Sequence, residues 1–190
     1  MLFGSGALLA LAPTMMPDGY SWTEHGISES AAQGIDGAWL ARMGFVVFGL
    51  AVIWLTSLRA GVWGTAGTVL HMCFGVCMFG VAAFSTRPWS DDATYVKSED
   101  LLHSVFASTM GFAFIVGTAS VLVARRLQIR RVALLDLGAV VITTALSAAM
   151  GVFPEIYGAL QRLMFLVAYC WYANEAHQQQ RHHASQRRSP

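Results

Sequence analysis

The sequence predicts an all-α protein, a polytopic transmembrane bundle of about six helices of which the first is short. Three observations predict it: the overall composition, the long apolar stretches, and the charges that alternate in sign between them. Of the 190 residues, 55% are hydrophobic and only 12% are charged, whereas about a quarter of the residues in an ordinary soluble domain carry a charge. Because this leaves too little polar surface for a soluble globular domain, the chain is expected to lie in a bilayer.

The predicted helices correspond to apolar stretches that are each about as long as a bilayer core requires. Five such stretches lie at residues 37–58, 61–84, 101–124, 132–153 and 157–172, the last being the shortest. A further apolar segment, residues 1–11, stays well below the roughly 17 residues that a span requires, so we expect it to form the short first helix. The connections after Leu58 and Phe153 are only a few residues long, which predicts that the helices they join are antiparallel neighbours.

The polar segments between the apolar stretches alternate in sign. Four carboxylates and no Lys or Arg precede Gly37, residues 87–100 are mostly acidic, and residues 125–131 are basic. By the positive-inside rule the acidic loops lie outside, which places both termini in the cytoplasm. Eleven arginines against one lysine are typical of a GC-rich bacterial genome, so we expect a multi-pass protein of a bacterial cytoplasmic membrane. Residues 1–176 would form the bundle and residues 177–190 a disordered basic tail in the cytoplasm.

The cysteines do not indicate a disulfide framework or a metal site. Cys73, Cys77 and Cys170 all fall inside apolar stretches. His71 is close in sequence to two of them, but residues two apart diverge by about 200° on a helix, so His71 and Cys73 cannot both face one ion. We therefore expect no metal and no cofactor. Basic residues beside membrane spans are explained by topology and anionic lipid, so no nucleic-acid partner is expected either.

Asp136 is the only carboxylate on the inner half of a predicted span. A relay for protons or cations would require further ionisable groups along a path, so pairing of Asp136 with Arg59 or Arg131 is the favoured interpretation. Trp54 and Trp63, near the inner rim, are expected on outward faces of the bundle, where a partner subunit could cover them.

Three cationic or titratable residues lie just inside the expected outer ends of their helices: Arg42, His103 and Arg162. At a rise of about 1.5 Å per residue, all three lie a few ångströms below the outer rim and therefore share one depth. Charged groups at such a depth usually face the bundle and are paired. The carboxylates nearest in sequence are Glu29, Asp36, Glu99, Asp100 and Glu155. The sequence thus predicts an outward-facing polar vestibule.

Two interpretations of this vestibule involve no chemistry. In the first it is structural, because arginines can pair or extend toward the outer headgroups, and Asp100 would cap its helix. In the second it binds a ligand or a lipid headgroup through Arg42, Arg162, Arg87 and His25. Arginine suits that role because its planar fork matches phosphate and carboxylate groups.

In the third interpretation the vestibule is catalytic. His103 would act as a general base or metal ligand, oriented by Asp100 or Glu29. A zinc hydrolase requires three correctly spaced ligands, and only His25 and His103 with a carboxylate are candidates. No local nucleophile or zinc motif such as GxSxG or HExxH occurs, so catalysis ranks below binding.

Two segments of the outer loops carry a resemblance to a known family. One is GYS at residues 19–21 followed by HGISE at residues 25–29, and the other is FSTRP at residues 84–88 followed by LHS at residues 102–104. In this order they resemble the bacterial membrane family called domain of unknown function 998, over most of the chain. The resemblance implies a helical membrane bundle with a cluster of motifs outside the cytoplasm, and it implies no established activity.

The same resemblance favours His103, Ser28 and Glu29 as site residues. Arg87 stands where the family more usually has an acidic residue, so no carboxylate role is transferred to that position.

The function we expect is that of a lipid- or partner-binding membrane protein, or of an accessory subunit of a membrane complex. Its partners would be membrane lipids and other membrane protein subunits. The alternative is an outer-face, hydrolase-like enzyme that acts on a lipid or envelope substrate with His103. A small transporter ranks last, because neither broken mid-membrane helices nor an inverted repeat is visible in the sequence.

Overall fold

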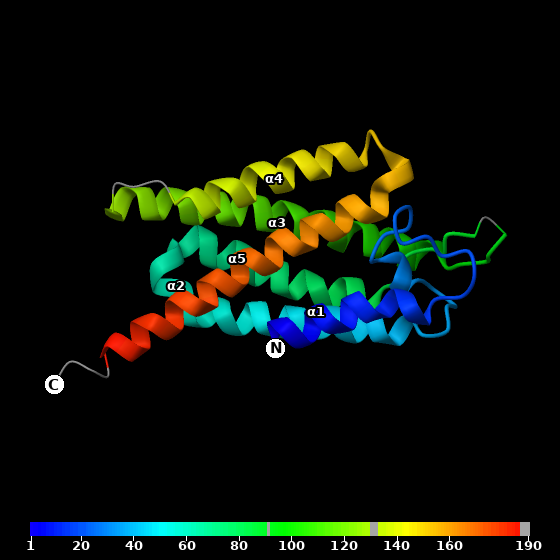
Figure 1. Ribbon diagram of the computed structural model, residues 1–190, viewed down its shortest axis with the longest axis horizontal. Helices are drawn as coiled ribbons and strands as arrows, with labels where there is room; N and C mark the ends of the chain where they lie inside the picture. The colour runs from blue at the N-terminus through cyan, green and yellow to red at the C-terminus, as the bar shows by residue number, and fades with distance from the viewer. Residues whose placement is uncertain (91, 130–132, 187–190) are drawn as a thin grey trace.

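In the computed structural model the protein is a bundle of α-helices, and the structure describes residues 1–90, 92–129 and 133–186 (Figure 1). The α-helices are α1 (Leu2–Leu11), α2 (Ala38–Ala83), α3 (Lys97–Ile129), α4 (Leu134–Met150) and α5 (Tyr157–Gln186). Short 3-10 turns lie between them: η1 (Ala12–Met15), η2 (Glu29–Ala31) and η3 (Pro154–Ile156). The all-helical prediction is confirmed for the described residues.

The described part of the chain contains five α-helices rather than about six, because α2 includes two of the predicted spans. Its backbone leaves the helical region at Gly64, with φ 70° and ψ 169°, a conformation that is essentially restricted to glycine. Beyond this residue α2 runs back along its own first half, as Figure 1 shows. The rings of Phe48 and Phe74, one from each arm, lie 5.6 Å apart. The predicted antiparallel pair after Leu58 is therefore present, joined by a glycine bend inside one helix.

The two arms of α2 approach closely because glycines face each other between them. A Cβ atom added at Gly49 would lie 2.8 Å from the carbonyl oxygen of Gly75. Small residues allow such close contact where helices pack in lipid. Next to this contact the bundle core is aromatic: Tyr172 of α5 lies against Phe74 and Phe114, with ring centroids 5.5 and 5.8 Å apart.

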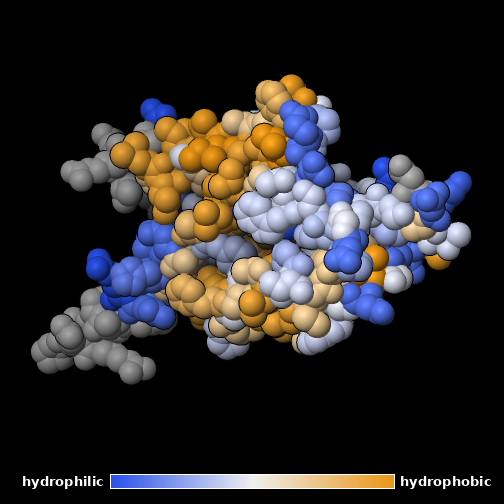
Figure 2. Space-filling model, turned by 45° about the vertical axis from the view of Figure 1, so that its right-hand side comes forward, coloured by the Kyte–Doolittle hydropathy of each residue, from blue (hydrophilic) through white to orange (hydrophobic). Residues whose placement is uncertain are grey.

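The ends of the bundle carry opposite charges. The segments 12–37, 84–96 without residue 91, and 151–156 gather at one end, which we call the loop end (Figure 1). Every described carboxylate except Asp136 and Glu175 lies in or beside these segments. The opposite end, which we call the arginine end, carries Arg59, Arg125 and Arg126. Figure 2 shows hydrophobic side chains over much of the helical part of the visible face and hydrophilic residues at both ends.

By length and composition α2 and α3 can each cross a membrane, and the bent pair of α4 and α5 adds a third candidate if it is counted as one span. α1 is shorter, as predicted, and packs against both α2 and α5: Leu9 touches Gly44, and the Ser5 hydroxyl hydrogen-bonds to the Tyr169 hydroxyl. In Figure 1 the N-terminus lies beside the middle of the bundle. The cytoplasmic position of the two termini stays a prediction.

α5 continues beyond the predicted end of the bundle at residue 176 and ends at Gln186. Residues 177–186 of the segment expected to be a disordered tail are therefore helical, and residues 187–190 lie outside the described residues. Gln178 and Gln179 of this extension accept hydrogen bonds from Arg59. The first turn of the extension thus belongs to the packed structure.

We predict that Gly64→Ala destabilises the protein by about 1–3 kcal/mol, because a Cβ atom at this φ and ψ strains the backbone even though the nearest side-chain atom is 3.7 Å away. Thermal unfolding in a mild detergent measures the effect. Gly61→Ala is the matched control, since Gly61 lies in the same helix with open space around it and no positive φ. Equal unfolding midpoints for the two variants would contradict the prediction.

Candidate functional site

Arg162 holds the first loop of the loop end, the segment 12–37, against α5. One terminal nitrogen of its guanidinium donates to the carbonyl oxygens of Trp22 and His25, at 2.7 and 2.8 Å, and the other donates to the Tyr20 hydroxyl at 2.6 Å. The guanidinium carbon also lies 4.7 Å from the centre of the Trp22 ring, a cation–π contact. Burial raises the pKa of the Tyr20 phenol and the adjacent guanidinium opposes that rise.

Arg42 has a similar role at the other side of the same loop. Its guanidinium donates to the carbonyl oxygens of Ala31 and Ala32, at 3.3 and 3.2 Å, where η2 ends. The expected carboxylate partners of Arg42 and Arg162 are therefore replaced by backbone carbonyls within the described residues. The physical reason is that an irregular loop leaves carbonyl groups without partners, and buried carbonyls require donors.

His25 is part of the packing of the first loop. Its Nδ1 accepts a hydrogen bond from the Ser21 backbone N–H at 2.8 Å, so this nitrogen carries no proton. Its ring stacks on Trp89 of the second loop, which is the segment 84–96 without residue 91, with centroids 5.4 Å apart. Tyr20 contacts both rings. His25 thus joins the two loops.

Asp100 holds the second loop. Its Oδ1 accepts hydrogen bonds from the Thr86 hydroxyl at 3.0 Å and from the Arg87 backbone N–H at 2.8 Å. α3 begins at Lys97, so Asp100 lies in its first turn and is not the capping residue that the sequence suggested. The carboxylate is favourably placed near the positive end of the helix dipole.

His103 lies one turn further along α3 and is buried. Its Nδ1 lies 2.8 Å from the carbonyl oxygen of Phe84, and because a carbonyl only accepts, Nδ1 must carry the proton. Glu29 accepts a hydrogen bond from the Gly26 backbone N–H. Within the part of the chain that the structure describes, no hydrogen bond joins His103 to Asp100 or Glu29. The Phe84 carbonyl therefore orients His103.

A cleft opens at the loop end beside His103. It consists of a mouth of about 520 Å³ and a deeper chamber of about 360 Å³. The two hollows share the lining residues Ser28, His103, Ala107, Ser108, Tyr157 and Gln161, so they form one continuous cleft. The mouth is also lined by Glu24, Glu29, Thr86, Arg87, Ser104 and Pro154.

The lining changes from polar to apolar with depth. Apart from the shared residues and Ser147, the chamber is lined by Phe45, Val81, Met110, Gly111, Phe112, Ile115, Met150, Met164 and Phe165. A smaller hollow of about 20 Å³ has Met110, Gly111, Met164 and Phe165 in common with the chamber, and Phe74, Phe114, Thr143 and Ala168 complete its wall. The cleft therefore has a hydrophilic entrance and a hydrophobic interior, the arrangement that suits an amphiphile.

Gln161 lies where the polar and apolar parts meet. Its side-chain nitrogen donates to the Ser28 hydroxyl at 3.1 Å and to the Tyr157 hydroxyl at 3.2 Å, while its oxygen accepts from the Ser28 backbone N–H at 3.4 Å. The sequence does not single out Gln161 or Tyr157, because neither residue carries a charge or belongs to a motif. An amide in the first turns of an otherwise apolar span was the available signal.

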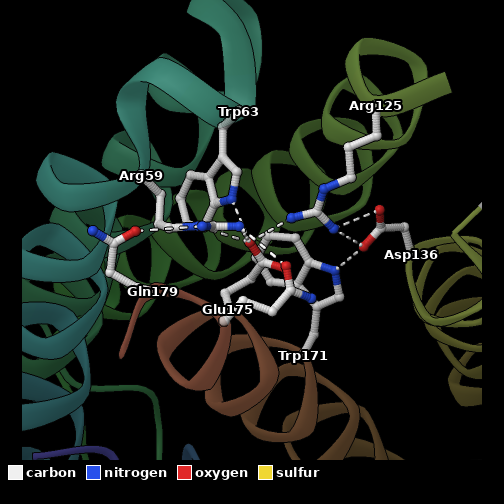
Figure 3. Close-up of polar contacts among 8 residues, drawn as sticks. Arg59, Trp63, Arg125, Asp136, Trp171, Glu175 and Gln179 are labelled. Carbon is white, nitrogen blue, oxygen red and sulfur yellow. Dashed lines mark hydrogen bonds and ion pairs between the residues drawn. The ribbon is translucent and has the colours of Figure 1, made fainter. Parts of the chain in front are cut away.

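The arginine end contains a second polar cluster, which is buried (Figure 3). Arg125 donates to both oxygens of Asp136, at 2.9 and 2.8 Å, and to Oε2 of Glu175 at 2.6 Å. Arg59 donates to the same Glu175 oxygen at 2.9 Å. The side chains of Asp136 and Glu175 are both 0% exposed. We call Arg59, Trp63, Arg125, Asp136, Trp171 and Glu175 the ion network.

Two indole N–H groups complete the ion network. Trp63 donates to Glu175 at 2.7 Å and Trp171 donates to Asp136 at 2.9 Å (Figure 3). The expected outward position of Trp63 is therefore wrong, since its side chain is buried against the carboxylate, whereas Trp54 is 68% exposed.

Asp136 pairs with Arg125 and not with Arg59, which corrects the first of the two expected partners. The second, Arg131, lies outside the described residues. Glu175 was missed as a partner because it stands beside the basic tail. A signal was available in the four-residue spacings Arg59–Trp63 and Trp171–Glu175, which place each pair on one helix face.

No set of three His, Cys, Asp or Glu side chains that could hold a metal ion occurs among residues 1–90, 92–129 and 133–186. Cys73, Cys77 and Cys170 are free thiols.

We predict that Glu175→Gln lowers the free energy of unfolding by about 3–5 kcal/mol, because it leaves two buried guanidinium groups with only one carboxylate. The thermal unfolding midpoint in mild detergent is the measurement. Glu155→Gln is the control, since Glu155 is exposed at the loop end. A Glu175→Gln protein as stable as this control would show that the ion network does not hold the helices together.

The comparison with protein families gives a match over residues 4–176 to the family described as "Protein of unknown function (DUF998)". Comparisons with curated proteins and with solved structures gave no match. The two loop segments that resemble this family lie beside the mouth of the cleft and supply Ser28, Glu29, Thr86 and Arg87 to it. With a family match over most of the chain and apolar helices long enough to span a bilayer, this protein is a helical membrane protein that belongs to the DUF998 family.

Proposed function

We propose that the protein binds a membrane amphiphile in the cleft at its loop end. The observation that carries the proposal is the change in lining, from carboxylate, hydroxyl and amide groups at the mouth to Phe, Met, Val and Ile side chains in the chamber. A headgroup would occupy the mouth and an acyl or prenyl chain the chamber. Burial of apolar chain surface supplies the affinity, at about 25 cal/mol per Å².

The position of the chamber supports entry from the bilayer. Phe112 of α3 lines the chamber and is 64% exposed, so the chamber reaches the outer surface of the bundle at the depth of the apolar helices. On the other side its wall includes Ser147 and Met150 of α4. α3 and α4 separate toward the loop end in Figure 1. A lipid chain could therefore enter sideways without crossing water.

The loop end is proposed to face outward from a bacterial cytoplasmic membrane. The support is the distribution of charge, with arginines at one end and nearly all carboxylates at the other, read by the positive-inside rule. In this orientation the cleft would receive lipids from the outer leaflet.

The geometry gives less support to an outer-face hydrolase. The expected hydrolase site has His103 oriented by a carboxylate, and the His103 Nδ1–H donates instead to the Phe84 carbonyl oxygen. Asp100 and Glu29 accept hydrogen bonds from loop groups. An accessory-subunit function would require a surface for a partner, and a single exposed residue such as Trp54 does not define one.

We predict that Gly111→Trp lowers binding of a photo-crosslinkable diacyl lipid at least about tenfold, equivalent to about 1.4 kcal/mol. Gly111 lines the chamber, and no atom lies within 4 Å of a Cβ atom added there, so the indole should fill the chamber without disrupting the helix. Labelling of the purified protein in nanodiscs, followed by mass spectrometry, measures the loss.

Gly138→Trp is the control for this experiment. Gly138 also lies within a helix, has nothing within 4 Å of an added Cβ atom, and does not line the cleft. If the two variants retain equal labelling, the cleft is not the lipid site and the proposal fails. If the wild-type protein is labelled only where a co-purified protein is absent, a partner occupies the cleft instead.

A further inference from the structure

We infer that the amphiphile carries an uncharged, hydroxyl-bearing headgroup, such as a glycerol or a sugar, and not a phosphate. This inference rests on the proposed function and concerns the same cleft. It follows from two properties of the mouth: the sign of its charges, and the hydrogen-bonding state of its hydroxyl groups.

The charges of the mouth do not suit an anion. Glu24 and Glu29 contribute two carboxylates to its lining, while Arg87 is the one Lys or Arg side chain that lines it among the described residues. Phosphate groups are usually bound by several cationic or N–H donors, because these shorten and strengthen the hydrogen bonds. A phosphate in this mouth would lie near more negative than positive charge.

The other two arginines that the structure describes at the loop end, Arg42 and Arg162, do not line the mouth. Arg162 uses both terminal nitrogens on the first loop and on Tyr20, and Arg42 uses its guanidinium on the carbonyls that end η2. The sequence alone had made these two arginines candidate phosphate ligands. Because both arginines hold loop groups and neither lines the mouth, they offer no direct contact to an anionic headgroup there.

The neutral groups of the mouth suit a polyol. The Gln161 amide donates to the oxygen atoms of both Ser28 and Tyr157, so each of these hydroxyls acts as an acceptor toward the amide. A hydroxyl that accepts in this way keeps its own proton for another acceptor. Both hydroxyls are therefore set to donate into the cleft, toward hydroxyl or ether oxygens of a ligand.

The carboxylates provide the complementary acceptors. One oxygen of Glu29 accepts from the Gly26 N–H, and a carboxylate has several lone-pair positions, so capacity remains for ligand hydroxyl groups. A sugar or glycerol can donate to carboxylates and accept from hydroxyls at the same time. A phosphate group carries negative charge and is repelled by the same carboxylates.

The test compares lipids with identical acyl chains and different headgroups on the full-length protein in nanodiscs. The probes are monoglucosyl diacylglycerol, phosphatidic acid and phosphatidylethanolamine, each competing against one photo-crosslinkable diacylglycerol. We expect the glucosyl lipid to compete at least about tenfold better than phosphatidic acid.

Tyr157→Phe tests the donor role of one hydroxyl. Loss of a single neutral hydrogen bond should weaken competition by the glucosyl lipid about threefold to tenfold and leave phosphatidic acid unchanged. Tyr169→Phe is the matched control, because the Tyr169 hydroxyl bonds to Ser5 in the groove between α1 and α5, away from the cleft. Gln161→Leu should reduce the headgroup preference further, and Tyr157→Phe remains informative if that variant does not fold.

The outcomes separate this inference from the proposed function. If phosphatidic acid competes as well as the glucosyl lipid, or if Tyr157→Phe and Tyr169→Phe behave alike, the headgroup inference is overturned while lipid binding stands. Preferred competition by phosphatidylethanolamine would overturn it in favour of a cationic headgroup attracted by the carboxylates. If no lipid competes and Gly111→Trp has no effect, the proposed function itself fails.

Discussion

The carboxylate of Glu175 is the contact on which the architecture of this bundle depends. One of its oxygens accepts hydrogen bonds from Arg59 and Trp63 of α2 and from Arg125 of α3, while Arg125 also binds Asp136 of α4. Four helices are thereby joined at a single buried point. Buried charges are costly unless they are paired, so these contacts favour the arrangement in which the four helices meet here.

The ion network holds the helices together at the arginine end, so they can separate at the loop end. α3 and α4 are held together at the ion network. The cleft lies toward the opposite end, where no ion pair joins the helices in the part of the chain that the structure describes. The loops there are fixed by arginines bound to backbone carbonyls, which hold the loops without filling the space between the helices. The buried ion pairs of the described residues and the amphipathic cleft thus lie at opposite ends of the bundle.

At the mouth of the cleft, too, one polar side chain positions the groups around it. Gln161 carries no charge, yet it sets the direction of two hydroxyl protons and ties the first loop to α5. Two carboxylates that the sequence suggested as salt-bridge partners, Glu29 and Asp100, accept hydrogen bonds from loop N–H groups instead. The site that results is polar, weakly acidic and adjacent to apolar surface, which is a suitable environment for a neutral lipid headgroup.

The sequence by itself determined the helical membrane class, the short first helix, the reversal near residue 60 and the opposite charges of the two ends. These properties follow from local sums of hydropathy and charge, which do not depend on how a helix is rotated. Only the tertiary structure decided that Asp136 pairs with Arg125, that Trp63 points inward, that Arg42 and Arg162 bind carbonyls, and that Gln161 and Tyr157 belong to the cleft. The reason is that these helices are apolar on nearly every face, so their sequences carry little information about which face turns inward, and the choice is made by contacts between residues far apart in the chain.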